Sequence, residues 1–168
     1  PSSAASDVYK RQFQAAATLA TTGIDVVAIK QAVSTRTRGQ VAAYGYVAQD
    51  MASMRWGFSY NVTTITQSDM WDFNFNAADA HAAVNAARNM DGLLAWAVAI
   101  EQDGEETGTR FFRVSLRSNG PTINHIASHF GGGGHPLAAG CTVAVGELDT
   151  VRELLAKAVD SYRAEQED

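Results

Sequence analysis

The chain has 168 residues, of which 46% are hydrophobic, so it is long enough to bury one substantial core. It carries 13 lysines and arginines against 18 aspartates and glutamates, which argues against a protein that coats long nucleic acids by unspecific phosphate neutralisation. A local cationic pocket for a small phosphorylated ligand remains compatible with this charge balance.

Two short helices are expected in the first part of the chain. Pro1 to Gln12 has no apolar period and is expected to be a tail or a cut end, whereas the alanine-rich segment from Phe13 to Ala20 favours a helix. Asp25 is a suitable N-cap for a second helix, and the polar run from Ser34 to Arg38 would then be a linker or a domain edge. The second helix would place on one side Ile29, Ala32 and Val33.

A longer helix and a strand are predicted next. Apolar residues recur at helical spacing from Val41 to about Met54, and apolar and polar residues alternate between Gly57 and Thr66. The alternation predicts a strand with one buried face. The helix positions are Val41, Tyr44, Gly45, Ala48, Met51 and Ala52, and the inward strand positions are Phe58, Tyr60, Val62 and Thr64.

The middle of the chain predicts another helix, followed by a buried strand. Asn76, with Asp79 three positions later, is typical of a variant capping box, and the alanine-rich helix that it opens is expected to end near Asp91-Gly92. Leu93 to Ile100 is almost wholly apolar, as in strands that are covered on both faces. We therefore expect this strand at the centre of the sheet.

The next strand is predicted from Arg110 to Arg117, after an acidic turn from Gln102 to Gly108. Pro121 suits the first turn of a following helix, which the glycine run would end. In the strand, Phe112, Val114 and Leu116 would face one way, and Arg113, Ser115 and Arg117 the other. The apolar stripe of the helix would be Ile123, Ile126, Ala127 and Phe130.

The end of the chain predicts a last strand from Cys141 to Val145 and an amphipathic final helix that begins at Leu148. The charged end from Arg163 to Asp168 is expected to be a solvated tail. Together these elements predict a mixed α/β fold, with a mixed sheet of about four to five strands and packed helices.

Cys141 is the single cysteine, so an internal disulfide and a thiolate metal cluster are excluded and a reducing compartment is favoured. No apolar stretch approaches membrane-spanning length, and the first residues lack the pattern of a secretory signal. We therefore expect a cytoplasmic protein with no membrane partner.

Four successive glycines, Gly131 to Gly134, precede His135. One glycine is enough to end a helix, so the run favours a loop whose backbone approaches an anion or a flat base. A flexible connection is the alternative, since glycine runs are common in loops. A histidine fixed beside such a loop can donate to a phosphate oxygen or protonate a leaving group, although it can also be an ordinary surface histidine.

A second candidate anion site is the segment Arg117-Ser118-Asn119-Gly120, which lies between a predicted strand and a predicted helix. An arginine at a strand end can also be a solvated edge charge. Because the segment lies so close in sequence to the glycine run, the two are expected to form a two-sided cradle.

Two further sets of residues, a histidine pair and the tryptophans, favour structural interpretations. His125 and His129 lie four residues apart, as in some zinc helices, but the glutamate of such helices and a third ligand are lacking, so an exposed helix face is favoured and no metal site is assigned. The tryptophans are expected to be core or core-edge residues rather than a stacking platform; they are Trp56, Trp71 and Trp96.

The strand end Val114 to Ser118, the short helix, Gly131 to His135 and then Ala138-Ala139-Gly140 together resemble the C-terminal associated domain of DHH phosphoesterases. They most resemble the branch of bacterial oligoribonucleases and phosphoadenosine-phosphate phosphatases, which includes cyclic dinucleotide phosphodiesterases. The resemblance implies that residues 39–168 form the substrate-binding domain. Residues 1–38 would be a tail, the last helices of a preceding DHH catalytic domain, and a linker.

The resemblance also implies roles for individual residues. Arg117 and Ser118 would grip substrate phosphate, the backbone of Gly132, Gly133 and Gly134 would approach the ligand, and His135 would reach the reacting phosphate as the catalytic residue of this chain. The substrate would be a short oligoribonucleotide or a nucleotide phosphate. The sequence does not decide the oligomeric state, and a homodimer is among the states it allows.

The Asp-His-His run that holds manganese in the family's catalytic domain is absent from this chain. The isolated chain is therefore expected not to hydrolyse substrate, and its partner would be the missing catalytic domain. Two other hypotheses stay open. One is a noncatalytic RNA-binding module, like the related domain at the end of alanyl-tRNA synthetases, and the other is a small α/β domain whose glycine run serves only topology.

Overall fold

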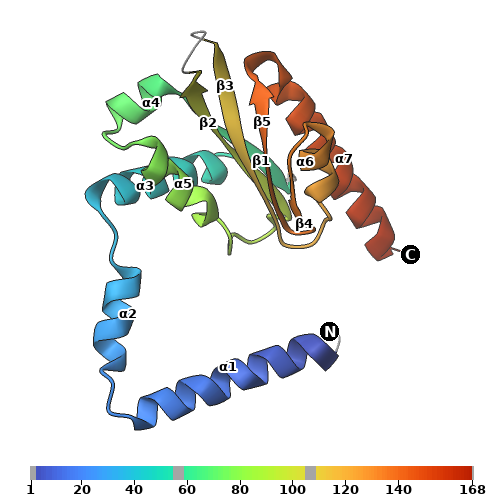
Figure 1. Ribbon diagram of the computed structural model, residues 1–168. Helices are drawn as coiled ribbons and strands as arrows, with labels where there is room; N and C mark the ends of the chain where they lie inside the picture. Colours follow the sequence, from blue (N-terminus) through green and yellow to red (C-terminus); the bar gives the residue numbers. More distant parts are fainter. Residues whose placement is uncertain (1–2, 55–58, 105–108, 168) are drawn as a thin grey trace. The chain divides into compact units, whose positions relative to one another are not determined.

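The computed structural model describes residues 3–54, 59–104 and 109–167, and the chain divides into two compact units, Pro1–Arg36 and Thr37–Asp168. The first unit contains α1 (Ser3–Thr21) and α2 (Val26–Ser34) (Figure 1). The N-cap predicted for α2 is confirmed, because the Asp25 side chain accepts a hydrogen bond from the Ala28 amide at 2.9 Å. No residue of α2 is buried within the described chain.

The expectation of an irregular tail up to Gln12 is wrong from Ser3 onward, because α1 is continuous from Ser3 to Thr21. Its described side chains are exposed, so no apolar period was needed to form it. Alanine, lysine, arginine and glutamine have high intrinsic helix propensity, which favours a helix here without an apolar period.

The second unit is built on a five-stranded mixed sheet with the strand order β1-β2-β3-β5-β4, which confirms the predicted fold class. β1 runs parallel to β2, and the other neighbouring pairs are antiparallel. The strands are β1 (Tyr60–Ile65), β2 (Ala95–Asp103), β3 (Arg110–Ser118), β4 (Gly133–His135) and β5 (Ala138–Ala144).

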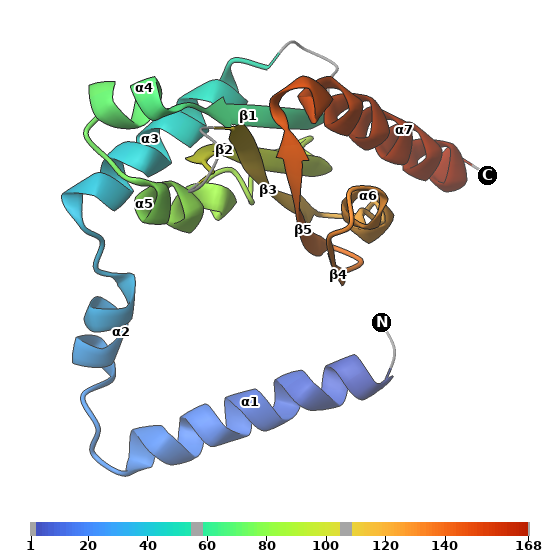
Figure 2. The ribbon, with the colours of Figure 1, turned by 45° about the horizontal axis from the view of Figure 1, so that its top comes forward.

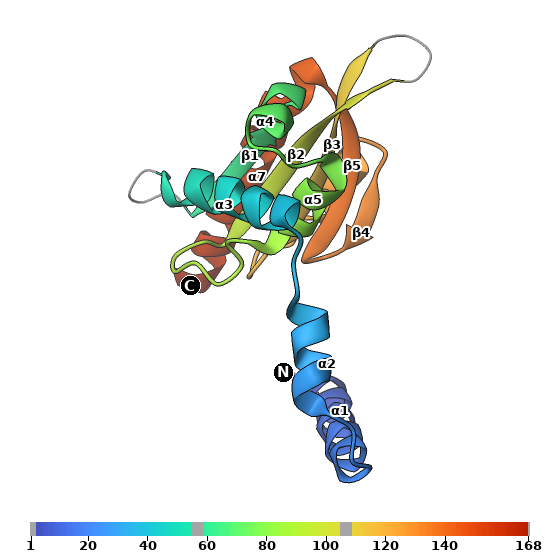
Figure 3. The ribbon, with the colours of Figure 1, turned by 90° about the vertical axis from the view of Figure 1, so that its left-hand side faces the viewer.

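Helices cover the two faces of this sheet unequally. One face packs against α6 (Asn124–His129) and α7 (Leu148–Glu167), and the core there includes residues from β1, β2, β3 and β5 (Figure 2). The other face packs against α3 (Arg38–Ala52), α4 (Gln67–Asp72) and α5 (Ala77–Ala82), with the short 3-10 helix η1 (Ala83–Asn85) (Figure 3). This second core contains residues of β1 and β2 but none of β3, β4 or β5 among the described residues. The part of this face formed by β3, β5 and β4 is therefore left open.

The apolar strand β2 is buried on both faces from Ala95 to Glu101, as its composition predicted. Alternate residues enter the two cores, with Ala97 on the α6–α7 side and Val98 on the α3–α5 side. The middle position of the sheet belongs to β3 rather than to β2, so the predicted centre is one strand away. The glycine segment adds β4 as an edge strand that the sequence analysis did not expect.

Two helices of the α3–α5 layer, α3 and α5, differ from their predictions. α3 begins at Arg38, where a capping box between Thr37 and Gln40 starts it, and its buried stripe is Ala43, Val47 and Met51. Val41, which was expected on the apolar side, is 59% exposed. The capping box at Asn76 is confirmed, but α5 ends at Ala82 instead of near Gly92, because the chain tightens there into η1.

The helix α4 was not predicted, although Thr66 and Asp69 form a capping box at its start. β1 was expected to have one buried face, but Thr63 is only 1% exposed and Val62 only 7%. Both faces are covered because β1 lies between the two helix layers. Gly57 and Phe58 of the predicted strand lie outside the described residues.

The elements after β3 follow the predicted order with shifted ends. α6 begins at Asn124, so Pro121 precedes the helix instead of entering its first turn. The expected stripe is confirmed at Ile123, Ile126 and Ala127, each of which is fully buried. α7 continues to Glu167, so the charged end is helical rather than a tail, although most of its side chains are exposed.

No helix among the described residues is both long enough and apolar enough to cross a membrane.

Candidate functional site

The open part of the sheet face brings residues of β3, β5 and β4 together in rows. Arg117 pairs with Ala138, which pairs in turn with His135. Ser115 pairs with Gly140, which pairs with Gly133. Paired residues on neighbouring strands project from the same face. The short side chains of β5 at Ala138 and Gly140 therefore leave a shallow surface, the floor of the open face, between the polar residues of β3 and the glycine segment.

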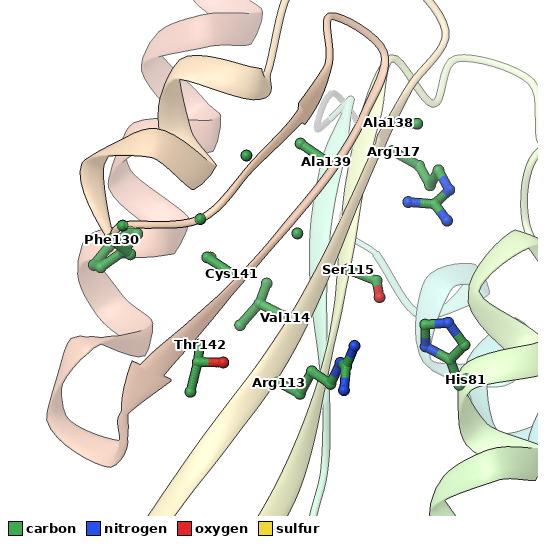
Figure 4. A pocket seen from close by; sticks show the side chains of 14 residues that line it. His81, Arg113, Val114, Ser115, Arg117, Phe130, Ala138, Ala139, Cys141 and Thr142 are labelled. Atoms are coloured by element: carbon green, nitrogen blue, oxygen red, sulfur yellow. The ribbon is translucent and has the colours of Figure 1, made fainter.

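A cavity of about 620 Å³ lies at this part of the sheet (Figure 4). β3 contributes Arg113, Ser115 and Arg117 to its lining, the glycine segment contributes Gly131 to Gly133, and α5 contributes His81. The two arginines and His81 gather on one side of β3, with Ser115 between them. This side of the cavity is therefore framed by side chains that donate hydrogen bonds.

The charge of the cavity is opposite to the net charge of the chain. Among the described residues, its lining includes two arginines and a histidine but no aspartate or glutamate, while the whole chain has a net charge of −5. Within the part of the chain that the structure describes, neither Arg113 nor Arg117 forms a salt bridge with a carboxylate. Two unneutralised guanidinium groups beside a hollow are suited to an anion.

Arg117 is the more enclosed of the two arginines. Its Nη1 donates a hydrogen bond to the Leu116 carbonyl oxygen at 2.8 Å, which holds part of the guanidinium in place. Burial lowers the pKa of Arg117 from its ordinary value, because desolvation disfavours the charged form. An incoming anion would replace the lost hydration of this group.

The four glycines do not all serve the cavity in the same way. Gly131 has φ +72°, and Gly134 has φ +146° with no room for a side chain, because a Cβ there would lie 2.5 Å from the Ala138 oxygen. A Cβ on Gly132 would lie 2.2 Å from the Gly140 oxygen. A Cβ on Gly133 would meet nothing within 4 Å, so chain packing does not require glycine at this position.

The backbone amides of the first two glycines are already engaged. Gly131 N–H donates to the Ser128 oxygen at 3.1 Å, and Gly132 N–H donates to the Ala127 oxygen at 2.9 Å. These bonds close the end of α6. Gly132 therefore allows close approach of the chain to β5, and its N–H points into α6 rather than toward a ligand.

Three residues expected at the site do not line the cavity, namely Ser118, Gly134 and His135. Ser118 is 8% exposed, and its hydroxyl donates to the Leu94 oxygen at 3.2 Å and accepts from the Gly120 amide at 3.0 Å. These bonds fix the turn after β3. His135 is exposed and lies beyond the lining, two strands from Arg117 and about 10 Å away by strand spacing. Both side chains rise from the same face, so a ligand above Ala138 could reach both.

Cys141 lines the cavity but is poorly suited to be a nucleophile. It is 7% exposed and belongs to the core on the α6–α7 side. Burial, with a smaller contribution from the charge of Glu147, raises the pKa of the Cys141 thiol to about 11. The thiol is therefore protonated near neutral pH and acts as a packing residue.

His125 and His129 are both exposed on α6, as expected. No group of three or more His, Cys, Asp or Glu side chains that could hold a metal ion occurs in residues 3–54, 59–104 and 109–167. Trp96 is a core residue, as predicted, and its indole Nε1 donates to the Val84 oxygen at 2.6 Å. Trp71 was also expected in or near the core, but it is 86% exposed. Trp56 lies outside the described residues.

Arg113, Ser115 and His81 line the cavity but were not among the predicted site residues. The alternation of β3 already placed Arg113 and Ser115 on the side of Arg117, so the strand period could have identified them. His81 comes from α5, a separate element that precedes β3 in the chain, and only the tertiary contact between α5 and the sheet brings it to the cavity.

A manganese ion, which the family resemblance implies for the parent enzyme, does not fit this cavity. Hard divalent cations prefer carboxylate and carbonyl oxygens. The charged lining groups are Arg113 and Arg117, which would repel a cation, and no carboxylate is available among the lining residues. The described lining of this cavity therefore does not suit a divalent cation.

Comparisons with known proteins give one consistent family. The model of the DHHA1 domain matches residues 57–161, which is more than half of the chain. The bifunctional oligoribonuclease and PAP phosphatase NrnA of Bacillus subtilis (strain 168) is 35% identical over 79 residues, 47% of this chain and 23% of that protein. A probable bifunctional oligoribonuclease and PAP phosphatase NrnA of Streptococcus mutans is 38% identical over 77 residues, 45% of this chain and 23% of that protein. The matched segment thus spans about a quarter of the length of these relatives.

The fold is also found among solved structures. The crystal structure of an exopolyphosphatase-related protein from Bacteroides fragilis matches with a TM-score of 0.68 and 21% sequence identity. The match covers 94% of this chain and 45% of that chain.

Proposed function

The chain belongs to the DHHA1 domain family, related to the NrnA proteins, and from this we propose that its open sheet face binds the phosphate groups of a nucleotide or short oligoribonucleotide for a DHH phosphoesterase. The observation that carries the proposal is the cavity beside Arg117, which contains two arginines without carboxylate partners among the described residues. In an acidic chain, such a site would concentrate an anion at one place instead of attracting nucleic acid everywhere.

Each part of the cavity would have its own task. Arg117 would donate two hydrogen bonds to one phosphate group, and Ser115 and His81 would offer further donors to its oxygens. Gly133 would let the ligand lie close to the floor, since its missing side chain leaves open space. His135 would contact the same phosphate from the edge strand, with Ala138 beneath the ligand.

We propose that cleavage takes place on a separate catalytic domain. The DHH domain of the family would hold manganese, which activates the attacking water. This chain would supply binding and orientation, because its cavity is suited to hold the substrate's negative charge and not the metal's positive charge. The isolated chain is then expected to bind substrate without hydrolysing it.

Calorimetric titration of the 168-residue chain with phosphoadenosine phosphate tests the proposal. We expect saturable binding, and Arg117→Ala should weaken it by about 10- to 100-fold, the range for one lost charge-assisted contact. Arg152→Ala is the matched control, because Arg152 belongs to α7 on the other face of the sheet and should leave the affinity unchanged.

Two results would count against the proposal. One is the absence of binding at millimolar nucleotide, which would support a glycine run that serves topology alone. The other is tight, strongly salt-dependent binding of folded tRNA without any nucleotide binding, which would favour the RNA-binding module.

A further inference from the structure

The cavity beside Arg117 is followed, on the side of α5, by two further cavities. His81 and Arg113 also line a neighbouring cavity of about 290 Å³, together with Ala77 and Gln102. Ala77 and Gln102 in turn line a third cavity, of about 530 Å³, which lies against α4. Each cavity shares two residues with the next, so the three follow one another from the glycine segment to α4.

The far end of this series has a different chemistry from the first cavity. Its lining includes the amide side chains of Gln67, Asn74, Asn76 and Gln102, and it contains no arginine, lysine or histidine. Amides pair well with the donors and acceptors on the edges of bases and poorly with phosphate charge. The cationic end and the amide end are thus separated along the surface.

Trp71 lies at the amide end and lines the third cavity. Its side chain is 86% exposed, and no aromatic ring of the described residues stacks against it. By contrast, the nearby Phe73 packs edge-on against Tyr46, with ring centroids 5.1 Å apart. A large aromatic face left open at the end of a groove is suited to stack a base.

The one carboxylate that lines this end is already engaged. Asp79 Oδ1 accepts a hydrogen bond from the Thr37 hydroxyl at 3.2 Å, and Asp79 Oδ2 accepts one from the backbone N–H of Asn76 at 3.3 Å. It is the N3 residue of the capping box that Asn76 opens at the start of α5. Its charge disfavours a phosphate group at this end, which agrees with a base being held here and phosphates being held near the arginines.

The length of the series sets the size of the ligand. Arg117 and Arg113 lie four residues apart on β3, which corresponds to about 13 Å, so each would hold a different phosphate group. We infer that the three cavities form one groove for a single-stranded oligonucleotide of at least two nucleotides, with its phosphates at Arg117 and Arg113 and a base stacked on Trp71. This inference rests on the proposed function, because it extends the same phosphate site.

The test compares ligands of increasing length on the full chain. Dissociation constants are measured for adenosine monophosphate and for 5′-phosphorylated adenylate oligomers of two, three and five nucleotides. We expect the affinity to rise with length until the groove is filled. Trp71→Ala should weaken binding of the three-nucleotide ligand by about tenfold, within the range for one stacked base, and leave monophosphate binding unchanged.

Val145→Ala is the control for loss of an exposed apolar side chain, because Val145 is 48% exposed and does not line the groove. The stacking can also be measured by tryptophan fluorescence. A base stacked on Trp71 should quench the fluorescence of Trp71, and this quenching should be lost in Trp71→Ala. The buried Trp96 provides a steady background.

Failure of the groove and failure of the phosphate site give different results. If monophosphate binds and depends on Arg117, but affinity is independent of length and of Trp71, the groove is overturned and the phosphate site stands. If neither monophosphate nor any oligomer binds, the phosphate site itself is overturned. Equal weakening of all ligands by Trp71→Ala would also contradict the groove, since Trp71 would then act on the first cavity.

Discussion

One face of the sheet has two halves that share the same strand geometry and differ in what covers them. On β2, Trp96 and Val98 point into the core formed with α3 and α5. On the neighbouring β3, their register partners are Arg117 and Ser115, which line the cavity instead. The same alternation therefore gives a buried core on one strand and the lining of an open cavity on the next, and the chemistry of the side chains decides which.

The largest expected effect is on the covered half. Trp96→Ala removes a side chain that is 1% exposed and leaves the Val84 oxygen without its donor. We expect it to lower the free energy of unfolding by about 3–5 kcal/mol, measured by urea denaturation. Trp71→Ala should change it by less than about 0.5 kcal/mol, because Trp71 is exposed. Similar losses for both variants would contradict the placement of Trp96 in the core and of Trp71 on the surface.

The second prediction concerns the open half. Arg113→Ala removes an exposed cation without a carboxylate partner in the described chain, so stability should be nearly unchanged. Binding of a dinucleotide should weaken by about tenfold, and its salt dependence should decrease by roughly one phosphate contact. Binding constants at several salt concentrations check this prediction, with Arg152→Ala as control. An unchanged salt slope would mean that Arg113 contacts no phosphate.

The features of the two halves were not equally predictable from the sequence, and the reason is physical. The alternation of β3 follows directly from the two-residue strand period, and it correctly placed Phe112, Val114 and Leu116 in the core. The N-caps Asp25 and Asn76 were also readable, because capping is local. These are features that a few neighbouring residues determine.

The contacts that distinguish the two halves are not local. Nothing near His81 in the sequence indicates that it faces β3, and the exposure of Trp71 depends on where α4 comes to lie. The glycine run was attributed to a ligand loop as a whole, yet Gly131, Gly132 and Gly134 are each explained by backbone conformation or by close contact with β5. That contact requires the fold of β4 against β5, which glycine composition does not reveal.

A third prediction uses Cys141, which packs on the α6–α7 side of the sheet. Its folded-state pKa is raised to about 11, so the folded protein keeps a proton that the unfolded chain loses from about pH 9. The stability that the protonated thiol contributes is fully present below the ordinary thiol pKa, and it is lost as the pH rises toward 11. We expect Cys141 to account for about 1–2 kcal/mol of this loss. Thermal denaturation of the chain and of Cys141→Ala between pH 8 and 11 measures it, and parallel curves for the two proteins would refute the assignment.

The smallest expected effect lies in the floor of the open half and distinguishes structural glycines from a ligand glycine. Gly133→Ala adds a methyl group that meets nothing within 4 Å in the chain, so the free energy of unfolding should change by less than about 0.5 kcal/mol. Nucleotide affinity should still fall by about threefold to fivefold, because the methyl group occupies space above the floor beside Ser115 and Gly140.

Gly146→Ala is the matched control, since its Cβ also meets nothing and it does not line the cavity. Gly132→Ala should instead destabilise the fold, because its Cβ would collide with the Gly140 oxygen. If Gly133→Ala and Gly146→Ala bound nucleotide equally well, the glycine segment would contribute only its backbone path, and the phosphate site would be formed by the side chains of β3 and α5.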